Sequence, residues 1–378
     1  MVKISVIVPV FNCEDYIEES IGGILNQTFN DIEIICVDDG STDSSLGMLN
    51  RMAAEDSRLK VYSQENQGSS IARNNALSKA GGDYVYFFDA DDYIAEDCLE
   101  KIYCNAIAND SDIAIFYFDI YENDSFLRHC SIDLDKKFPY VDHNNFTFNY
   151  RDYMQFAFKG SSAPWFKLYK KEFLDEHDFI KFPINLNHND VPFHIMTILN
   201  ASKISFLPEY LYHYRLDNPN SISNNRQKRY DDIFSIIQIV EDYLRAEGLF
   251  DDLKKEFDFL KVNHITYQIS GRPDEYFDLA KEELSAMDLS NDYLTKNMLF
   301  KANTILYSNS MEEYNYKIEI NKLGKENDKL SKDNKQIKKQ NKDLKSQIKK
   351  LQKQYDEILD SNSWKMTEIF RKIRHCIR

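Results

Sequence analysis

The sequence predicts an α/β fold: a mostly parallel β-sheet flanked by helices, followed by a helical region and a long C-terminal coiled-coil helix. Two observations lead to this prediction. Over the first hundred residues, short β-branched or aromatic runs alternate with helical repeats, as is typical of parallel sheets covered by helices on both faces. From residue 320, apolar residues recur with the spacing of a coiled coil.

Each expected strand ends in a polar turn. Residues 4–8 are rich in β-branched side chains and end at Pro9, and residues 14–29 follow with the apolar spacing of a helix. The second strand leads into a turn over residues 38–43 that can cap the next helix. The third strand precedes a helix that starts near Gly68. The second, third and fourth strands are expected at residues 32–37, 59–62 and 84–88.

Polar side chains follow three of these strands, and the carboxyl ends of parallel strands are where ligands bind in such sheets. Asp39 can accept hydrogen bonds from a base or a ribose, Phe11 can lie against a base, and Arg73 can meet a carboxylate or a phosphate. Each residue also has an ordinary interpretation: Phe11 as core, Arg73 as a surface ion pair, and Asp39 as a turn former. The segments that follow strands, residues 9–12, 38–40 and 89–92, all converge on one sheet edge, which favours a binding site.

Three carboxylates follow the fourth strand within four positions, at Asp89, Asp91 and Asp92. Unpaired buried carboxylates are costly, so the group belongs where the strand leaves the core. Carboxylate oxygens suit a hard divalent cation, and magnesium is usually held by one or two of them together with substrate phosphates. The alternative is an acidic turn that caps the next helix, and of the three carboxylates Asp92 is the one that we leave to capping. Glycine-rich dinucleotide and triphosphate motifs are absent from the sequence, which disfavours those two classes of site.

With these residues the sequence resembles the family 2 glycosyltransferases of the GT-A fold. The resemblance implies a nucleotide-sugar donor, most often a UDP-sugar, and inversion at the anomeric carbon. It implies a divalent metal, Mn²⁺ or Mg²⁺, with Asp91 as the favoured ligand and Asp89 as a ligand that also contacts the donor. The matching motifs are residues 6–12, 26–28, 37–43, 66–68 with 72–74, and 88–92. The resemblance places Pro9, Phe11, Asn12, Asp39, Asn66, Arg73, Asp89, Asp91 and Arg215 at the donor.

The resemblance also implies a general base downstream, at Asp190, which would take a proton from the acceptor hydroxyl. Asn189 stands where the family usually has Glu, and Asp190 as a simple helix cap is the alternative. Residues 163–169 resemble an acceptor-side element. Residues 210–215 and 220–223 resemble a strand and loop that close over the donor diphosphate. There Arg215 can pair with a phosphate and His213 can approach the metal, although the same alternation suits a half-buried strand.

Composition narrows the compartment and the partners. Of the 378 residues 43% are hydrophobic, no run is long enough to span a membrane, and no secretory signal is recognisable. The six cysteines show no paired or metal-type spacing, so we expect reduced thiols and a cytoplasmic protein. Residues 317–378 carry 18 Lys and Arg against 9 Asp and Glu, and the remainder carries 29 against 53. An acidic body argues against nucleic acid as a partner.

The basic C-terminal part predicts two further contacts. Asn at three successive a positions of the heptad repeat favours a parallel homodimer, and a single solvated helix is the alternative. The a positions are Ile320, Asn327, Asn334, Asn341, Ile348 and Tyr355, and the d positions are Leu323, Leu330, Ile337, Leu344, Leu351 and Ile358. Residues 361–367 resemble a tail motif of some bacterial and archaeal glycosyltransferases. The basic amphipathic pattern around it suits either peripheral contact with the inner face of the membrane or packing on the protein.

We therefore expect four parts: a GT-A catalytic domain at 1–225, a helical region at 226–312, a coiled coil at 313–360 and a basic amphipathic tail at 361–378. The expected function is metal-assisted, inverting transfer of a sugar from a nucleotide-sugar to a hydroxyl of a glycan or polyol acceptor, in a cell-surface polysaccharide or glycoconjugate. The alternative from another class is a catalytically impaired sugar-nucleotide-binding scaffold that assembles through its coiled coil. A nucleotidyltransferase is disfavoured, because residues 9–12 supply no phosphate-binding glycine loop.

Overall fold

The chain was analysed as a computed structural model, which describes residues 2–122, 125–130, 134–216, 218, 229, 231–269, 272–290, 292–360 and 362–376. Its contacts divide the chain into two compact units, Met1–Leu306 and Tyr307–Arg378. The finer division into four parts stays a prediction. Within the described residues, no helix is both long enough and apolar enough to cross a membrane.

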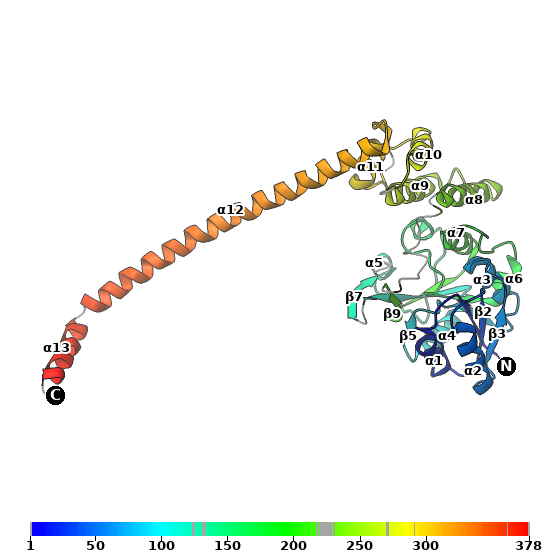
Figure 1. The fold of residues 1–378 in the computed structure, drawn as a ribbon, viewed down its shortest axis with the longest axis horizontal. Helices are drawn as coiled ribbons and strands as arrows, with labels where there is room; N and C mark the ends of the chain where they lie inside the picture. Colours follow the sequence, from blue (N-terminus) through cyan, green and yellow to red (C-terminus); the bar gives the residue numbers. More distant parts are fainter. Residues whose placement is uncertain are drawn as a thin grey trace. The chain divides into compact units, whose positions relative to one another are not determined.

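The first unit is built on a nine-stranded sheet with the order β3-β2-β1-β4-β8-β6-β9-β5, and β7 pairs with β6 (Figure 1). Strands β3, β2, β1 and β4 are parallel, as are β6 and β9, while β8 joins these two groups through antiparallel pairs with β4 and β6. The strands are β1 (Ile4–Val10), β2 (Ile32–Asp38), β3 (Leu59–Ser63), β4 (Tyr84–Phe87), β5 (Tyr93–Ile94), β6 (Ile113–Glu122), β7 (Ser125–Cys130), β8 (Lys167–Lys170) and β9 (Ile204–Arg215).

Helices cover this sheet and continue beyond it. Helix α3 packs on β1 and β2, α2 on β3, and α4 on β6 and β9. Helix α8 packs on α7 and α9, and α11 packs on α9 and α10. The helices are α1 (Ile17–Leu25), α2 (Ser45–Glu55), α3 (Ser69–Leu77), α4 (Cys98–Asn109), α5 (Leu134–Lys137), the 3-10 helix η1 (Met154–Ala157), α6 (Lys171–Glu176), α7 (Asp190–Asn200), α8 (Asp232–Ala246), α9 (Lys254–Gln268), α10 (Asp274–Ser285) and α11 (Lys296–Leu306).

The alternation of strands and helices in the first hundred residues is confirmed, with two differences at element ends. Strand β1 continues through Pro9 to Val10. Its register with β4 ends at Ile7, so the missing N–H of Pro9 breaks no hydrogen bond on that side. Helix α1 is shorter than the predicted 14–29. The Gln27 amide beyond its end donates to the carbonyl oxygen of Ala95 at 2.8 Å and fixes the chain there.

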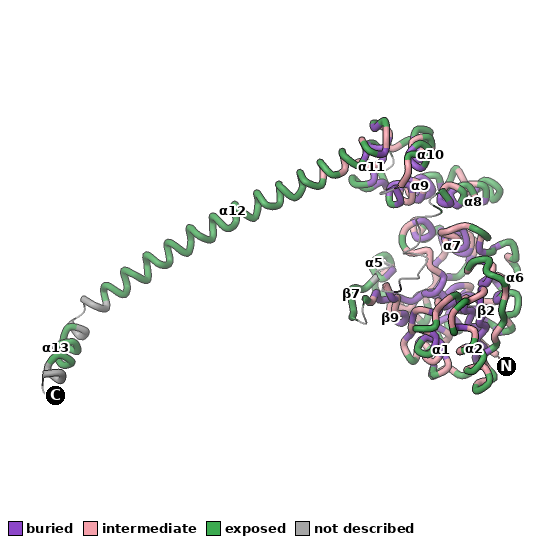
Figure 2. The backbone as a smooth tube through the Cα atoms, in the orientation of Figure 1, coloured by how far each residue is buried: buried purple, intermediate pink, exposed green. Residues whose placement is uncertain are grey.

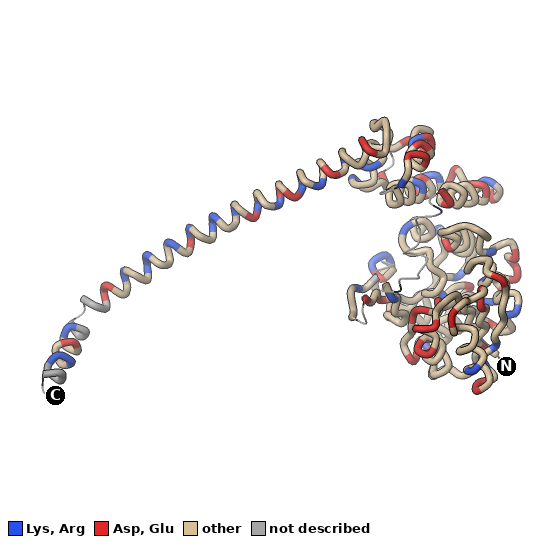
Figure 3. The backbone as a smooth tube through the Cα atoms, viewed as in Figure 1, with Lys and Arg blue, Asp and Glu red and all other residues tan. Residues whose placement is uncertain are grey.

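The second unit consists mainly of two helices, α12 (Met311–Asp360) and α13 (Asn362–Cys376). Figure 2 shows α12 exposed along almost its whole described length, and Figure 3 shows basic and acidic residues spread along it. Heptad residues such as Leu330 and Ile337 are therefore more than half exposed in the single chain. The side chains of residues 358–364 and from 373 onward lie outside the described part, so the predicted tail pattern can be followed only over residues 365–372.

Candidate active site

A cavity of about 290 Å³ opens at the carboxyl ends of β1, β2 and β4. The polar turns after these strands meet there because the strands are parallel neighbours. Seven residues predicted to contact a donor line it: Pro9, Phe11, Asp39, Asn66, Arg73, Asp89 and Asp91. The remaining lining residues are Val10, Cys13, Gly68, Ser69, Ala90, Tyr214 and Asn218. Phe11 is 44% exposed, so its ring is available to a ligand.

Asp39 organises one wall of this cavity. Its carboxylate accepts hydrogen bonds from the Gln64 side chain at 2.8 Å and from the backbone N–H groups of Gln67 at 2.9 Å and Gly68 at 2.7 Å. These bonds bring the loop that carries Asn66 against the end of β2. Gly40 has φ +74°, and a Cβ there would lie 2.9 Å from the backbone nitrogen of Asn66. Only glycine tolerates both the conformation and the approach.

Arg73 and Asp89 form an ion pair at the base of the cavity. The Arg73 guanidinium donates to Asp89 Oδ1 at 2.6 Å and lies 5.4 Å from the ring centroid of Phe182. Arg73 is only 8% exposed, and its Nε makes no hydrogen bond within the described residues. A buried guanidinium with a remaining donor, at the wall of a cavity, is suited to an anionic ligand.

Asp91 and Asp92 are neighbours with different surroundings. Asp91 lines the cavity and accepts a hydrogen bond from the Asn218 amide at 2.7 Å. Burial raises the pKa of Asp91, and the nearby charge of Asp89 raises it further. Asp92 does not line the cavity: it accepts hydrogen bonds from the Tyr212 hydroxyl at 2.5 Å and the Arg215 backbone N–H at 2.8 Å. Its carboxylate therefore joins β9 to the turn after β4, where we had expected it to cap a helix.

The residues present fit a divalent cation that arrives with a phosphate-bearing ligand. Of the three carboxylates that line the cavity, Asp39 already accepts three hydrogen bonds, which leaves Asp89 and Asp91 for a cation. The charge of Asp89 raises the pKa of Asp91, so a cation at both would relieve their repulsion. Within the described residues, no group of three or more His, Cys, Asp or Glu side chains forms a cation site. The chain thus offers two carboxylates, the number that magnesium commonly uses when phosphates complete its shell.

Three other residues considered from the sequence do not line the cavity. The Asn12 side chain accepts a hydrogen bond from the Thr42 N–H at 2.8 Å, which ties the end of β1 to the turn after β2. The Arg215 guanidinium donates to Glu19 at 2.7 Å. His213 Nδ1 lies 3.8 Å from Asp119 Oδ2, and its ring packs on Tyr93. Their predicted contacts with the donor or metal stay predictions, and the loop at 220–223 lies outside the described residues.

Asp190 is the first residue of α7, and it also stands apart from the residues that line the cavity. Its Oδ2 accepts a hydrogen bond from the Ser162 hydroxyl at 2.6 Å, and the positive end of the helix favours its charge. The completely buried Lys167 donates to the carbonyl oxygen of Ala163 at 2.5 Å. Burial lowers the pKa of Lys167 well below its usual value, and the charge of Asp190 opposes that shift.

Sequence reasoning missed Asn218 and Ser162, which hold the side chains of Asp91 and Asp190. Both residues are far in sequence from the carboxylate they contact. Asn218 lies three residues after the end of β9. A polar residue soon after a strand is the same pattern that marks the binding residues after the earlier strands. Ser162 comes just before residues 163–169, and no local pattern marks it as a partner of Asp190, 28 residues later.

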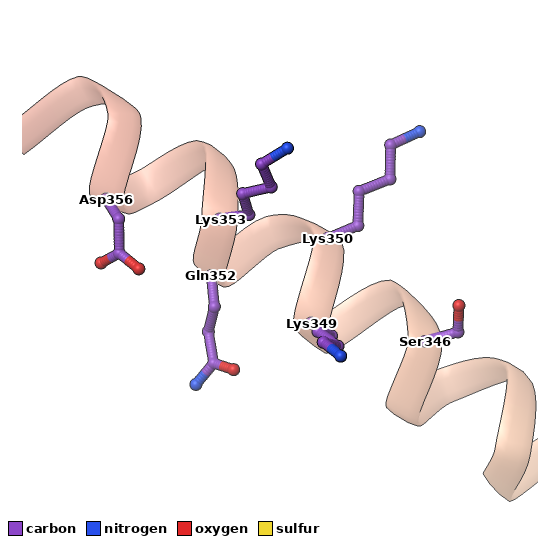
Figure 4. A pocket seen from close by; sticks show the side chains of 6 residues that line it. All are labelled: Ser346, Lys349, Lys350, Gln352, Lys353 and Asp356. Atoms are coloured by element: carbon purple, nitrogen blue, oxygen red, sulfur yellow. The ribbon is translucent and has the colours of Figure 1, made fainter.

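A second hollow lies along α12 and is lined by Ser346, Lys349, Lys350, Gln352, Lys353 and Asp356 (Figure 4). All six side chains come from one stretch of one helix and are exposed to solvent. The hollow therefore has a single wall, and a small molecule could not be enclosed there. The cavity at the strand ends is the better candidate site.

Comparisons with known proteins agree with this geometry. The model of the glycosyl transferase family 2 matches residues 5–177. A cholesterol galactosyltransferase of Borreliella burgdorferi is 31% identical over 253 residues, which cover 66% of this chain and 70% of that protein. Glycosyltransferase GlyG of Streptococcus pneumoniae serotype 4 is 32% identical over 225 residues, which cover 56% and 70%.

A solved structure shows the same fold. Residues 1–349 of TarS from S. aureus, crystallised with UDP-GlcNAc, align with a TM-score of 0.53 at 22% identity. The alignment covers 82% of this chain and 89% of that one. The likeness confirms the predicted GT-A fold class.

Proposed function

Because this chain belongs to glycosyl transferase family 2, we propose that it transfers a sugar, with inversion, from a nucleotide-sugar donor to a hydroxyl group of a glycan or polyol acceptor. The observation that carries the proposal is the single cavity lined by Asp39, Arg73, Asp89 and Asp91. Besides Asp39, it combines the exposed ring of Phe11, the buried guanidinium of Arg73 and the two carboxylates Asp89 and Asp91. Those are the groups that a base, a diphosphate and a divalent cation require.

The donor class is proposed as a UDP-sugar, and the acceptor as a cell-surface polysaccharide or glycoconjugate. TarS, which shares the fold, was crystallised with UDP-GlcNAc. A poly(ribitol-phosphate) beta-glucosyltransferase of Bacillus spizizenii is 29% identical over 281 residues, which cover 71% of this chain and 42% of that protein. Its name supports hexosyl transfer to a polymer, and the donor bound to TarS supports N-acetylhexosaminyl transfer. Phe11 would lie against the base, and Arg73 would meet a diphosphate oxygen, as proposed from the sequence.

Asp190 is proposed as the general base. Its position at the N-terminus of α7 and its hydrogen bond from Ser162 would keep the carboxylate oriented. It would accept the proton of the acceptor hydroxyl as the oxygen attacks the anomeric carbon. A divalent cation, Mn²⁺ or Mg²⁺, held by Asp91 and Asp89 would neutralise the charge on the departing nucleoside diphosphate.

A thermal-shift panel tests this function. The full-length protein is heated with UDP-, GDP-, dTDP- and CMP-sugars, each with and without MnCl₂. We expect one nucleotide class to raise the melting temperature, with a larger rise when manganese is present, and the Asp91→Ala variant to lose that rise. If no nucleotide sugar changes the melting temperature, the proposal is wrong. Donor binding without transfer to any hydroxyl acceptor would instead favour the scaffold function.

We also propose that the chain forms a parallel homodimer through α12. Its apolar heptad residues from Ile320 to Tyr355 are more than half exposed in the single chain, which is costly for a solvated helix of this length. Helix α13 presents Met366, Ile369 and Phe370, each more than half exposed, beside basic residues such as Arg371. That combination supports peripheral contact with an anionic membrane.

A further inference from the structure

The loop just before Asp190 adopts a strained backbone. Asn185 and His188 both have φ +58°, in the left-handed region. This conformation costs most residues with a side chain about 1–2 kcal/mol relative to the right-handed one, and it costs asparagine less because its short side chain can hydrogen-bond locally. Such residues persist where surrounding contacts hold them, and they cluster at functional sites. The contacts that hold this loop are therefore of interest.

Those contacts come from α8, α9 and Arg229 just before α8, in a region where the sequence shows no motif. The backbone N–H of Asn187 donates to Asp232 Oδ2 at 2.7 Å, at the first turn of α8. The Arg229 guanidinium donates to the carbonyl oxygen of Asn185 at 2.8 Å. The side-chain amide of Gln268, at the end of α9, lies 3.3 Å from Nε2 of His188. Asn185, Asn187 and His188 are thus all held by residues that lie outside the sheet.

The other segment that meets Asp190 is held by the same region. Ser162 donates to the Asp190 carboxylate, and Lys159 lies three residues earlier. The Lys159 ammonium lies 4.8 Å from the ring centroid of Phe259 in α9 and 4.6 Å from that of Tyr293. A half-buried cation over an aromatic face contributes about 1 kcal/mol. Two separate contacts from the helical region therefore flank Asp190.

The far end of α7 is attached to α8 as well. The Asn200 amide, at the last residue of α7, donates to the Tyr243 hydroxyl at 2.6 Å. The loop before α7, the helix itself and the segment that carries Ser162 thus all contact the region after residue 226, through α8, α9, Arg229 just before α8 or Tyr293 between α10 and α11. A shift of these helices would move Asp190 relative to the cavity.

We propose that α8 and α9 position the catalytic base, with Asp232 as the positioning residue. Asp232 is 9% exposed, and its carboxylate fixes the Asn187 N–H, so the loop keeps the strained form that sets the direction of Asp190. Asp232 does not line the cavity and acts only through the loop. The inference rests on the proposed function, because it takes Asp190 as the base.

The test compares the full-length Asp232→Ala and Asp232→Asn variants with the wild type. The matched control is Asp258→Ala, which removes another buried carboxylate of the helical region, one that pairs with Lys254 within α9. We expect Asp232→Ala to lower kcat by about 10- to 100-fold with an unchanged donor KM, because a misplaced catalytic group loses rate and not binding. Asp232→Asn should recover most of kcat, since its amide oxygen can accept the same N–H bond.

Amide hydrogen exchange of peptides within residues 183–190 gives a readout that does not depend on activity. We expect faster exchange in Asp232→Ala and wild-type exchange in Asp258→Ala. Unchanged exchange together with unchanged kcat would overturn the positioning role. Faster exchange with unchanged kcat would also overturn it, because the loop would then move without effect on the reaction. The Asp190→Asn variant tests separately whether Asp190 is the base: unchanged transfer there is a failure of the proposed function. If Asp232→Ala does not fold, Lys159→Met tests the other flank with the same two measurements and the same outcomes.

Discussion

Asp92 and Asp91 are adjacent in sequence, and we predict opposite consequences when each is replaced by alanine. Asp92 is 1% exposed and accepts hydrogen bonds from the Tyr212 hydroxyl and the Arg215 backbone N–H. Its removal leaves two buried donors without an acceptor. Asp91 accepts from Asn218 and lines the cavity, so its removal opens space for solvent at a site built to bind a ligand.

The size of the Asp92 effect follows from those two donors. A buried donor left without its partner costs about 1–3 kcal/mol, so the pair costs about 2–6 kcal/mol. Part of this loss is offset, because burial raises the pKa of Asp92 well above its usual value and its charged form is therefore unfavourable in the fold. We expect a net loss of about 2–4 kcal/mol in the free energy of unfolding. In a unit of this size, residues 1–306, that lowers the melting temperature by about 3–6 °C.

Differential scanning fluorimetry in metal-free buffer measures this loss. Asp92→Ala should melt lower than the wild type and still respond to the donor nucleotide with manganese. Asp91→Ala should melt at or above the wild-type temperature and show no response. In a Tyr212→Phe background, Asp92→Ala strands one donor fewer and should cost about 1–3 kcal/mol less. A wild-type melting temperature for Asp92→Ala, or an equal loss in Asp91→Ala, would refute the division of roles.

Four further outcomes are expected. Asp190→Asn should retain the donor-induced thermal shift while transfer falls by about 10²- to 10⁴-fold, and unchanged transfer in a radiolabel assay would place the base elsewhere. Burial raises the pKa of Asp91 above its ordinary value of 3.8, so its contribution to folding is lost as pH rises through the raised pKa. In scanning fluorimetry without metal, the melting temperature of Asp91→Asn minus that of the wild type should therefore increase from pH 4 to pH 7. A decrease in this difference would contradict the prediction. Ile337→Asp should shift the mass in sedimentation equilibrium toward the monomer while Lys335→Asp does not, and a wild type that is monomeric at all concentrations would remove the dimer. Truncation after Asp360 should reduce co-sedimentation with anionic vesicles, and equal co-sedimentation would exclude membrane contact by the tail.

The part of the fold that could be predicted from sequence is the part governed by local patterns. Strands β1, β2, β3 and β4 were expected from β-branched or aromatic runs, and each lies within a residue or two of its predicted bounds. Their parallel pairing follows from the helices between them. The antiparallel insertion of β8 between β4 and β6 could not be predicted from the sequence. It pairs β4 with residues more than 80 positions away, and no hairpin turn connects the two strands.

The same distinction applies to the site. The residues that line the cavity from Pro9 to Asp91 are grouped because parallel strands end at one sheet edge, a consequence that the sequence pattern already contains. Asn218 and Ser162 reach their carboxylates through the path of β9 and of the segment before β8. The sequence pattern suggested that Asp92 caps a helix, but in the structure its partners are two groups of β9. These contacts depend on how distant segments pack.

The sequence alone therefore determined which residues lie at the sheet edge, including its carboxylates, and the reaction class that they favour. The reason is local: the polar residues that follow a strand lie at its end, however the rest of the chain packs. Tertiary structure decided how those carboxylates divide. Asp91 lines the cavity, Asp92 accepts hydrogen bonds from β9, and Asp89 pairs with Arg73. They differ because each carboxylate's surroundings come from a different element. Tertiary structure also brought α8 and α9 against the loop before Asp190, a contact between segments that no local pattern encodes.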